Sequence, residues 1–350
     1  MDTVNLAYVV RVLQLLPIPG KDLIELAVIK GWKCIVKKGE FAVGDLAIYL
    51  AIGSVPDFED ANFAFLKQKN LNRIKTIKMG GVISQGLLGP LAWLTARGMT
   101  DLSEIKEGDD VATAMGVTKF IPPEESGQYA PSDNSKKRDP FPDYVPKTDA
   151  TRLQHAPDYY FEAIAGKDIV ITRKEDGCSA TFICYQNNFM LCGRNFVWDT
   201  VDASCAHYFN IAAQYGLADS LPALGRNLAI QGEICGPKIN ANRHKLTQTR
   251  FSVFDIYDID QQQYLGFDEM CAVCTTLGLS TVPLLYRGPA TEAVPNLTMD
   301  AFMAMAEAQE YAPGLPAEGI VVRSDDPRWR QRRVIFKLIS GVYCTLYNVY

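Results

Sequence analysis

The chain has 350 residues, of which 48% are hydrophobic and 21% charged, and its formal net charge is −5 at pH 7. A chain of this size and apolar content can build two domains with cores of their own, so it needs neither metal nor disulfide staples. It shows no basic-then-apolar leader and no apolar run long enough to span a bilayer, so we expect an intracellular protein without a membrane partner.

The cysteines and histidines argue against a disulfide framework, a zinc site and a Ser-His-Asp triad. Nine cysteines are scattered through apolar segments, which fits reduced core thiols better than a disulfide framework. Cys271 and Cys274 have a redox-like spacing, but they lie in a helix-like run without a second Cys or His pair nearby. The three histidines are not clustered in the sequence, which disfavours a zinc site or a Ser-His-Asp triad.

Short apolar runs separated by turn signals fill the N-terminal third of the chain. The runs cover residues 6–18, 26–29, 32–36, 46–52 and 73–83. This rhythm is typical of a small all-β barrel, and an OB-like fold is the leading candidate for residues 1–120. Residues 121–146 combine prolines with charged and small polar residues and show no apolar period, which predicts a linker.

Strand-like and helix-like runs are mixed in residues 147–350, which we expect to form the second domain. Strands are predicted over 168–174, 180–185, 189–192, 228–233, 251–257, 319–323 and 333–339. Helices are predicted over 202–215, 267–277 and 298–308. Because strands and helices do not alternate strictly, we expect the α+β class, with antiparallel sheets flanked by helices rather than a doubly wound sheet.

The tetrapeptide Lys174-Glu175-Asp176-Gly177 ends the first of these strands. Alone it fits a surface hairpin, in which Asp-Gly closes the turn and the lysine is solvated. Further motifs follow it in this order: Cys192-Gly193-Arg194-Asn195, Ile230-Gln231-Gly232-Glu233, Phe251 to Ile256, Ala317-Glu318-Gly319 to Arg323, and Val334 to Leu338. This set and order resemble the motifs of the ATP-dependent polynucleotide ligases and mRNA-capping enzymes, most closely those of an RNA ligase.

Two upstream segments resemble the Naegleria-type RNA ligases, known as RNA ligase family 5. The first runs from Ile18-Pro19-Gly20 to Ile83-Ser84-Gln85-Gly86, and the second is Lys147-Thr148-Asp149-x-x-Arg152-x-Gln154. In that family an OB-like domain precedes the nucleotidyltransferase domain. The resemblance implies a ligase that seals 3'-OH and 5'-phosphate ends, in nicked duplexes with RNA on the 3'-OH side. We expect it to act as a monomer.

Lysine suits the covalent step of such an enzyme, because its phosphoramidate holds a nucleotide and can pass it on. Lys174 is the predicted nucleophile, carrying AMP from ATP. A free lysine has a pKa of roughly 10.4 and is mostly protonated at neutral pH, so a nearby cation, Mg²⁺ or Mn²⁺, is implied to favour the neutral amine. On a strand, Lys174 and Asp176 begin on one face, Gly177 allows a tight turn against the nucleotide, and Glu175 points elsewhere or is read through its backbone.

The resemblance implies roles for residues in the later motifs. Arg194 would contact the nucleotide phosphate or the 5'-phosphate of the acceptor strand, because a guanidinium can bond two oxygens at once. Glu233 would contact the ribose or a metal-bound water, and Glu318 would bind the metal. Phe254 would stack on the base, although strand alternation alone fits a core position equally well.

Three further residues complete the predicted site. Lys337 would stabilise charge on the α-phosphate, and Arg152 and Gln154 would contact the triphosphate and the adenine. Position 335 is Ile, where the family pattern Lys-x-Lys has a first lysine, and Arg333 is a candidate to compensate. The roles of Lys337, Arg152 and Gln154 in nucleotide binding are implied by the resemblance and not by their spacing.

Other functions remain open at this point. A DNA ligase or a capping guanylyltransferase is disfavoured because those enzymes carry the OB domain after the catalytic one. A nucleic-acid-binding protein with a dead pocket is disfavoured by the joint presence of Lys174, Asp176, Glu233, Glu318 and Lys337. The negative net charge means that RNA binding must depend on local basic stretches, residues 67–78 and 323–337. The physiological RNA and the number of metals do not follow from the sequence.

Overall fold

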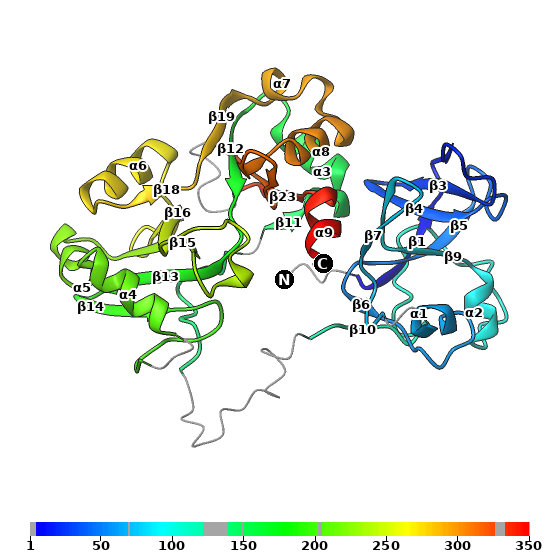
Figure 1. Cartoon of the computed structure of the whole chain (residues 1–350), viewed down its shortest axis with the longest axis horizontal. Coiled ribbons are helices and arrows are strands. Elements are labelled where there is room, and N and C mark those ends of the chain that lie inside the picture. The colour runs from blue at the N-terminus through cyan, green and yellow to red at the C-terminus, as the bar shows by residue number, and fades with distance from the viewer. Residues whose placement is uncertain are drawn as a thin grey trace. The chain divides into compact units, whose positions relative to one another are not determined.

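The computed structural model describes residues 5–68, 71–121, 139–148, 150–201, 205–325 and 333–349. They form two compact units (Figure 1). The first unit comprises Met1–Asn134, Gln154–Pro157 and Gly341–Tyr350, and the second comprises Ser135–Leu153 and Asp158–Ser340. Most of the predicted linker lies outside the described residues. No described helix has the length and apolar character needed to cross a membrane.

The first unit is built from short antiparallel strands. They are β1 (Ala7–Arg11), β2 (Gln14–Pro17), β3 (Ile24–Ile29), β4 (Trp32–Lys37), β5 (Leu46–Leu50), β6 (Ser54–Val55), β7 (Thr76–Met79), β8 (Val82–Gln85), β9 (Leu87–Pro90) and β10 (Thr118–Lys119). They pair in the orders β1-β5-β9, β2-β3-β4, β7-β8 and β10-β6. The short helices α1 (Ala64–Gln68) and α2 (Ala92–Ala96) were not predicted.

Alternation along β1 explains how these strands form a core. Tyr8 and Val10 join one buried cluster, with Trp32 and Tyr49, whereas the intervening Val9 joins a second cluster. Successive side chains of a strand point to opposite faces, so a strand with apolar residues at every position can be covered on both sides. The described residues of this part of the chain are thus mainly β-strands, as predicted, with the two short helices α1 and α2 added.

The last helix of the chain lies at the end of the predicted second domain. Residues 147–350 were predicted to form one unit, but α9 (Gly341–Tyr347) groups with the first unit and packs against β7. Tyr343 and Cys344 are fully buried. The burial of these side chains in the first unit is a long-range interaction, which local sequence patterns do not report.

The second unit contains two larger sheets. The five-stranded sheet has the order β11 (Thr151–Arg152), β23 (Ile335–Ile339), β22 (Gly319–Ser324), β12 (Asp168–Lys174) and β19 (Leu284–Pro289). The six-stranded sheet has the order β14 (Asn188–Cys192), β13 (Cys178–Tyr185), β15 (Leu228–Cys235), β16 (Arg250–Asp258) and β17 (Gln263–Tyr264), with β18 (Ser280–Thr281) also paired to β16. A separate hairpin joins β20 (Glu310–Ala312) and β21 (Leu315–Pro316).

Helices cover one face of each sheet. Beside the six-stranded sheet lie α4 (Ala206–Gln214), α5 (Leu217–Ser220) and α6 (Phe267–Thr276), and beside the five-stranded sheet lie α3 (Pro157–Ile164), α7 (Ala290–Ala293) and α8 (Met299–Glu307) (Figure 1). Within the described residues there are also short 3₁₀ turns: η1 (Leu153–His155), η2 (Pro222–Leu224), η3 (Asn240–Asn242) and η4 (Pro295–Leu297). Phe302 of α8 packs edge-on against Phe336 of β23, with ring centroids 5.7 Å apart.

The predicted α+β class is confirmed. Pairing is antiparallel throughout the described sheets except between β11 and β23 and between β16 and β18. The predicted helices at 267–277 and 298–308 form, and the Thr298 side chain accepts a hydrogen bond from the N–H of Ala301 as a cap. Of the helix predicted over 202–215, the structure shows Ala206–Gln214 with Cys205 as its N-cap, and residues 202–204 lie outside the described residues.

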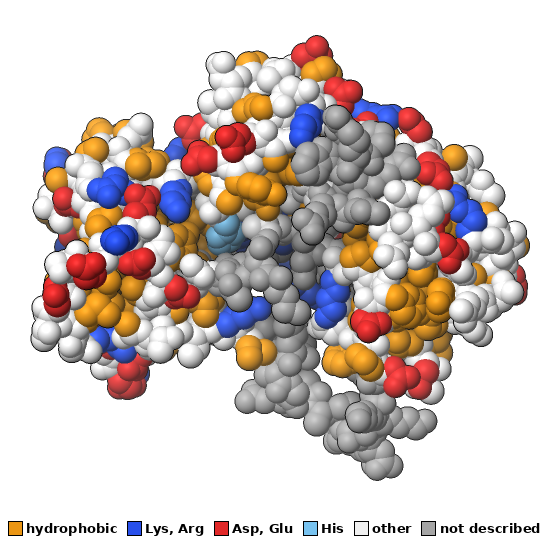
Figure 2. All heavy atoms as spheres, turned by 180° about the vertical axis from the view of Figure 1, so that it is seen from behind, with side chains coloured by type: hydrophobic (Ala, Val, Ile, Leu, Met, Phe, Trp, Pro, Cys, Tyr) orange, Lys and Arg blue, Asp and Glu red, His pale blue; other side chains and the backbone are white. Residues whose placement is uncertain are grey.

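Charged side chains of both signs are interspersed on the face of the molecule shown in Figure 2. No single basic stripe dominates the visible side chains there, as the net charge of −5 leads one to expect. Residues 69–70 and 326–332, which belong to the two predicted basic stretches, lie outside the described residues.

Candidate active site

Two residues far apart in sequence meet at the end of β12. The Lys174 Nζ lies 2.8 Å from Oε2 of Glu318, although 144 positions separate them in the chain. The pairing of β12 with β22 brings Lys174 opposite Gly319, the residue that follows Glu318. The Glu318 side chain is 1% exposed and that of Lys174 22%. The predicted nucleophile and the predicted metal-binding carboxylate therefore form a largely buried ion pair.

Glu233 brings a second carboxylate to this pair. It lies on β15 opposite Ser179, and its Oε1 accepts a hydrogen bond from the N–H of Gly177 at 3.1 Å. Burial above all, with the negative charges of Glu318 and Asp176, raises the pKa of Glu233 to about 8 against the opposing effect of Lys174. These groups are therefore close enough to influence one another's ionisation.

The donor set fits a hard divalent cation. Glu233 and Glu318 offer carboxylate oxygens, and the charge of Glu318 adds to the effect of burial in raising the pKa of Glu233. Mg²⁺ and Mn²⁺ accept oxygen ligands of this kind. The predicted metal ligands Glu233 and Glu318 are thus compatible with such an ion, which would relieve the repulsion.

Gly177 permits a close approach of two backbones. A Cβ at this position would lie 2.1 Å from the carbonyl oxygen of Ile234 on β15, so a side chain has no room here. The sequence attributed this glycine to a tight turn against a nucleotide. In the structure the neighbour that excludes a side chain is β15. Because Gly177 has no side chain, β15 can approach closely enough for Glu233 to accept a hydrogen bond from the N–H of Gly177.

Glu175 is neutralised inside the protein. Its carboxylate accepts from Arg173 Nε at 2.8 Å and from Arg250 Nη2 at 2.6 Å, and its side chain is fully buried. Two guanidinium groups leave this carboxylate little capacity for a ligand. The predicted nucleotide contact of Glu175 therefore rests on its backbone.

A loop segment that sequence reasoning missed holds Asp176. Its carboxylate accepts from Arg243 Nη1 at 2.9 Å and from Asn240 Nδ2 at 3.2 Å, and its N–H donates to His244 Nε2 at 3.1 Å. These partners lie in residues 236–249, between β15 and β16. The stretch is rich in Asn, Lys and Arg and contains turn residues, so by composition it is indistinguishable from a solvated loop.

His244 also lies beside Cys235 and Glu175, a trio whose ligand atoms are all within 4.8 Å of one another. The spacing would suit a metal, but the contacts do not. His244 Nε2 already accepts the Asp176 N–H, and Glu175 is held by two guanidinium groups. Burial lowers the pKa of His244 to about 4, so the ring is neutral at physiological pH. These contacts indicate a structural role for the trio.

Strand register places the remaining phosphate-binding candidates on one face of the five-stranded sheet. Arg152 is opposite Lys337, Lys337 is opposite Val321, and Val321 is opposite Thr172. Residues directly opposite one another in a sheet point to the same side. Lys174 lies two positions after Thr172 and shares that side. Arg152 and Lys337 therefore face the same side of the sheet as the predicted nucleophile.

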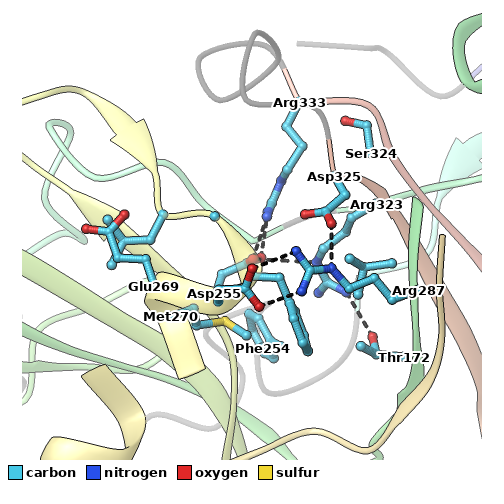
Figure 3. Close-up of a pocket in the computed structure, with 15 residues that line it drawn as sticks. Thr172, Phe254, Asp255, Glu269, Met270, Arg287, Arg323, Ser324, Asp325 and Arg333 are labelled. Carbon is cyan, nitrogen blue, oxygen red and sulfur yellow. Dashed lines mark hydrogen bonds and ion pairs between the residues drawn. The ribbon is translucent and has the colours of Figure 1, made fainter. Parts of the chain in front are cut away.

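A cavity of about 300 Å³ opens on this same side, lined by Thr172 and Val170 of β12, Arg323 of β22 and Phe254 of β16 (Figure 3). Between β15 and β16 the register shifts, so that Gln231 pairs with Asp255 and Gly232 with Val253. Phe254 is thus the extra residue of a β-bulge, which turns a side chain out of strict alternation. Its half-buried ring lines the cavity.

Arg333 does not replace the missing lysine of the last motif. It donates two hydrogen bonds to the Asp255 carboxylate, at 2.5 and 2.6 Å, in the cavity wall (Figure 3). Burial opposes the ionisation of Asp255, but Arg333 and Arg323 outweigh it and hold its pKa below the usual range. The suggestion that Arg333 compensates for Ile335 is therefore wrong, because its guanidinium is committed to Asp255.

Two further predicted residues have the following surroundings. Arg194 follows β14 and lines a small recess of about 10 Å³ with Lys147, Thr148 and Ser179. Gln154 is fully buried on η1 and belongs to the first unit. The structure thus brings together Lys174, Asp176, Glu233 and Glu318, and adds neighbours that the sequence did not indicate.

Comparisons with known proteins agree with this architecture. A family model described as RNA ligase matches residues 167–339, and one described as an OB-fold domain matches residues 6–91. The second match confirms the predicted OB-like domain. No curated protein matches the chain.

Solved structures of Naegleria gruberi RNA ligase match over almost the whole chain. A mutant form with ATP and Mn is 30% identical, with a TM-score of 0.78, and the match covers 97% of this chain and 98% of that one. A mutant with AMP and Mn is 29% identical, with the same TM-score and the same coverage. The form with pyrophosphate is 30% identical, with a TM-score of 0.77 and again the same coverage. The chain belongs to the Naegleria-type family of ATP-dependent RNA ligases, which are covalent nucleotidyltransferases.

Proposed function

We propose that this intracellular, monomeric ligase seals 3'-OH and 5'-phosphate ends through an AMP carried covalently on Lys174, and that its substrate is a nicked duplex with RNA on the 3'-OH side. The observation that carries the proposal is the 2.8 Å contact of Lys174 Nζ with Glu318, beside Glu233, at the end of β12. Its family membership supplies the reaction class. The Naegleria structures with ATP, AMP and pyrophosphate support the nucleotide and its products as ligands here.

The chemistry runs in three displacements at phosphorus. In the first, the Lys174 amine forms a bond to the α-phosphorus of ATP, the bond to the bridging oxygen breaks, and pyrophosphate leaves. In the second, an oxygen of the RNA 5'-phosphate displaces the lysine and takes the AMP. In the third, the 3'-hydroxyl attacks the activated 5'-phosphate, AMP leaves, and a phosphodiester forms.

The ion pair explains how the nucleophile is held before the reaction. Against Glu318, Lys174 is stabilised as an ammonium, which cannot attack phosphorus. Glu318 and Glu233 would hold a divalent cation, whose charge would favour the neutral amine and stabilise negative charge on the α-phosphate. Lys174 would then lose Glu318 as its partner and release its proton. The neutral amine would lie next to the cation that Glu318 holds, in a position to act as the nucleophile.

The cavity beside Phe254 is the proposed base pocket. Thr172 lines it two positions before Lys174, and the bulged Phe254 offers a ring face there. Stacking of a base on an aromatic ring contributes about 1 to 3 kcal/mol and tolerates any purine. Lys337 and Arg152, on the same side of the sheet, are the proposed triphosphate contacts, Arg194 is the proposed contact for the 5'-phosphate, and Gln154 stays a prediction for adenine.

The first test is covalent labelling. Purified protein is mixed with Mg²⁺ or Mn²⁺ and with ATP or GTP labelled at the α-phosphate, beside Lys174→Ala and beside Lys106→Ala, a matched control at an exposed lysine. We expect acid-labile label from ATP on the wild type and on Lys106→Ala only. Labelling by GTP instead would indicate a capping guanylyltransferase, and no labelling by either would favour a nucleic-acid-binding protein.

The second test is substrate choice. Duplexes with one nick are offered with RNA or DNA at the 3'-OH side, beside the same strands without a bridging complement. We expect sealing of the nick that has RNA on the 3'-OH side. Equal sealing of an all-DNA nick would favour a DNA ligase, and sealing of unbridged strands would contradict the nicked-duplex proposal.

A further inference from the structure

One tyrosine hydroxyl joins the backbones of the two residues that form the central ion pair. Tyr311 lies on β20, in the hairpin that precedes Glu318. Its hydroxyl donates to the carbonyl oxygen of Lys174 at 3.2 Å and accepts from the N–H of Glu318 at 3.1 Å. A hydroxyl has one proton to donate and lone pairs to accept. Tyr311 uses both capacities, and so connects the backbones of Lys174 and Glu318, the two residues whose side chains form the ion pair.

The ring of Tyr311 is fixed from two sides. It stacks on His244 with ring centroids 3.6 Å apart and an interplanar angle of 25°. Arg173 places its guanidinium 5.2 Å from the centre of the ring and donates to the carbonyl oxygen of Glu310 at 2.9 Å. His244 in turn accepts the N–H of Asp176. The β20–β21 hairpin is therefore attached to residues 173–176 through the ring of Tyr311 and the carbonyl group of Glu310, in addition to the Tyr311 hydroxyl.

The register of the sheet alone does not set the distance within the ion pair. Lys174 is the last residue of β12 and Glu318 precedes β22, so both lie just where the ladder ends. At that point the carbonyl oxygen of Glu318 still accepts from the N–H of Ser340 at 2.9 Å, but this contact leads to β23 and not to Lys174. The Tyr311 hydroxyl adds a contact that joins the backbones of Lys174 and Glu318 directly.

We propose that Tyr311 is a positioning residue for the first chemical step. Its hydroxyl holds the backbone of Lys174 in place relative to Glu318 and the cation that Glu318 would bind. Its stacking partner His244 holds Asp176. This inference rests on the proposed function. The hydroxyl should matter when Lys174 attacks ATP. It should matter much less when a 3'-hydroxyl attacks an RNA end that already carries AMP, because Lys174 does not react in that step.

The test removes the hydroxyl and keeps the ring. In Tyr311→Phe the stack on His244 and the contact with Arg173 are retained. The matched control is Tyr286→Phe on β19, which also removes one hydroxyl that donates to a carbonyl oxygen, that of Pro289 at 2.9 Å. For each protein three quantities are measured: the single-turnover rate constant of labelling from α-labelled ATP, the ATP concentration at half-maximal rate, and the rate of sealing a nick made with a pre-adenylylated strand.

We expect Tyr311→Phe to lower the labelling rate constant at saturating ATP about tenfold, the size that a lost positioning hydrogen bond produces. The half-saturating ATP concentration, the melting temperature and the sealing of the pre-adenylylated nick should stay within about twofold or a few degrees of wild type. Tyr286→Phe should match wild type throughout.

Each other outcome overturns the inference. Equal labelling rates for the two tyrosine variants would show that the hydroxyl positions nothing. A parallel loss of labelling and sealing, with a lower melting temperature, would show a structural contribution only. If wild-type protein fails to label at all, the proposed function fails first, whatever the two tyrosine variants do.

Discussion

Arg333 and Asp255 form a bidentate ion pair in the wall of the cavity, with donor-acceptor distances of 2.5 and 2.6 Å. A second guanidinium, that of Arg323, lies 3.5 Å from the same carboxylate and donates to the hydroxyl of Thr172 at 2.9 Å. The pair thus links β16 to the segment that leads into β23, and through Arg323 to β12. Because Asp255 is buried, its charge depends on these partners.

Removing Arg333 should therefore be costly. Arg333→Met leaves the Asp255 charge buried with Arg323 alone, and we expect the free energy of unfolding to fall by about 3 kcal/mol. Urea denaturation of the full chain measures it. The double variant Asp255→Asn with Arg333→Met should recover part of the loss, because no buried charge is left without its partner. A loss below about 1 kcal/mol in the single variant would contradict this assignment.

Glu233 predicts a pH-dependent difference in stability. Its pKa is raised in the folded protein to about 8, from 4.5, so the folded state favours the protonated form. The stability that this group contributes is complete below pH 4.5 and is lost as pH rises towards 8. Glu233→Gln mimics the protonated carboxyl, so wild type should lose stability relative to this variant from pH 5 to pH 8, and the difference should level off above that range.

Melting temperatures of the two proteins between pH 5 and pH 9 test this, with Glu104→Gln, at an exposed glutamate, as the matched control. The control should run parallel to wild type. If the melting temperature of Glu233→Gln also changes with pH in parallel with that of wild type, the pKa of Glu233 is not raised in the folded protein. We expect Glu233→Gln to lose ATP labelling as well, since it removes a predicted metal ligand.

His244 predicts the opposite slope. Burial lowers its pKa from 6.5 to about 4, so the folded protein resists a proton that the unfolded chain accepts. Its contribution to stability is present above pH 6.5 and is lost as pH falls through 4. His244→Phe keeps a ring against Tyr311 but removes the acceptor of the Asp176 N–H, and should cost about 1 to 3 kcal/mol at pH 7.

The gap between wild type and His244→Phe should narrow between pH 6.5 and pH 4. His207→Phe is a useful comparison, because burial also lowers the pKa of His207, which lies on α4 away from Tyr311. Only His244→Phe should reduce ATP labelling. A pH-independent gap would mean that protonation of His244 is not coupled to folding.

Gly177→Ala should damage both stability and activity. The added Cβ would lie 2.1 Å from the carbonyl oxygen of Ile234, and a backbone group cannot rotate away as a side chain can. We expect a loss of about 1 to 3 kcal/mol and a fall in ATP labelling, since the hydrogen bond from Gly177 to Glu233 must lengthen. Unchanged melting and labelling would show that β15 can move aside at no cost.

The sequence by itself determined the class of the fold and the family. Short apolar runs such as those of β12 and β16 predict their own strands, because their length and composition are local properties of the chain. The order of the motifs around Lys174, Glu233 and Glu318 identified a nucleotidyltransferase, because residues of the same chemistry in the same order are rarely found by chance. The OB-like domain followed from the same two kinds of signal.

Only the tertiary structure decided which groups surround these residues. Tyr311, His244 and Arg243 come from a hairpin and a loop whose composition is that of solvated segments, and they reach Lys174 and Asp176 only after distant strands have paired. The bulge that turns Phe254 towards the cavity and the pairing of Arg333 with Asp255 likewise depend on neighbours across the sheets. A local pattern carries propensity and periodicity, whereas the partner of a side chain is set by packing between segments that one sequence does not relate to each other.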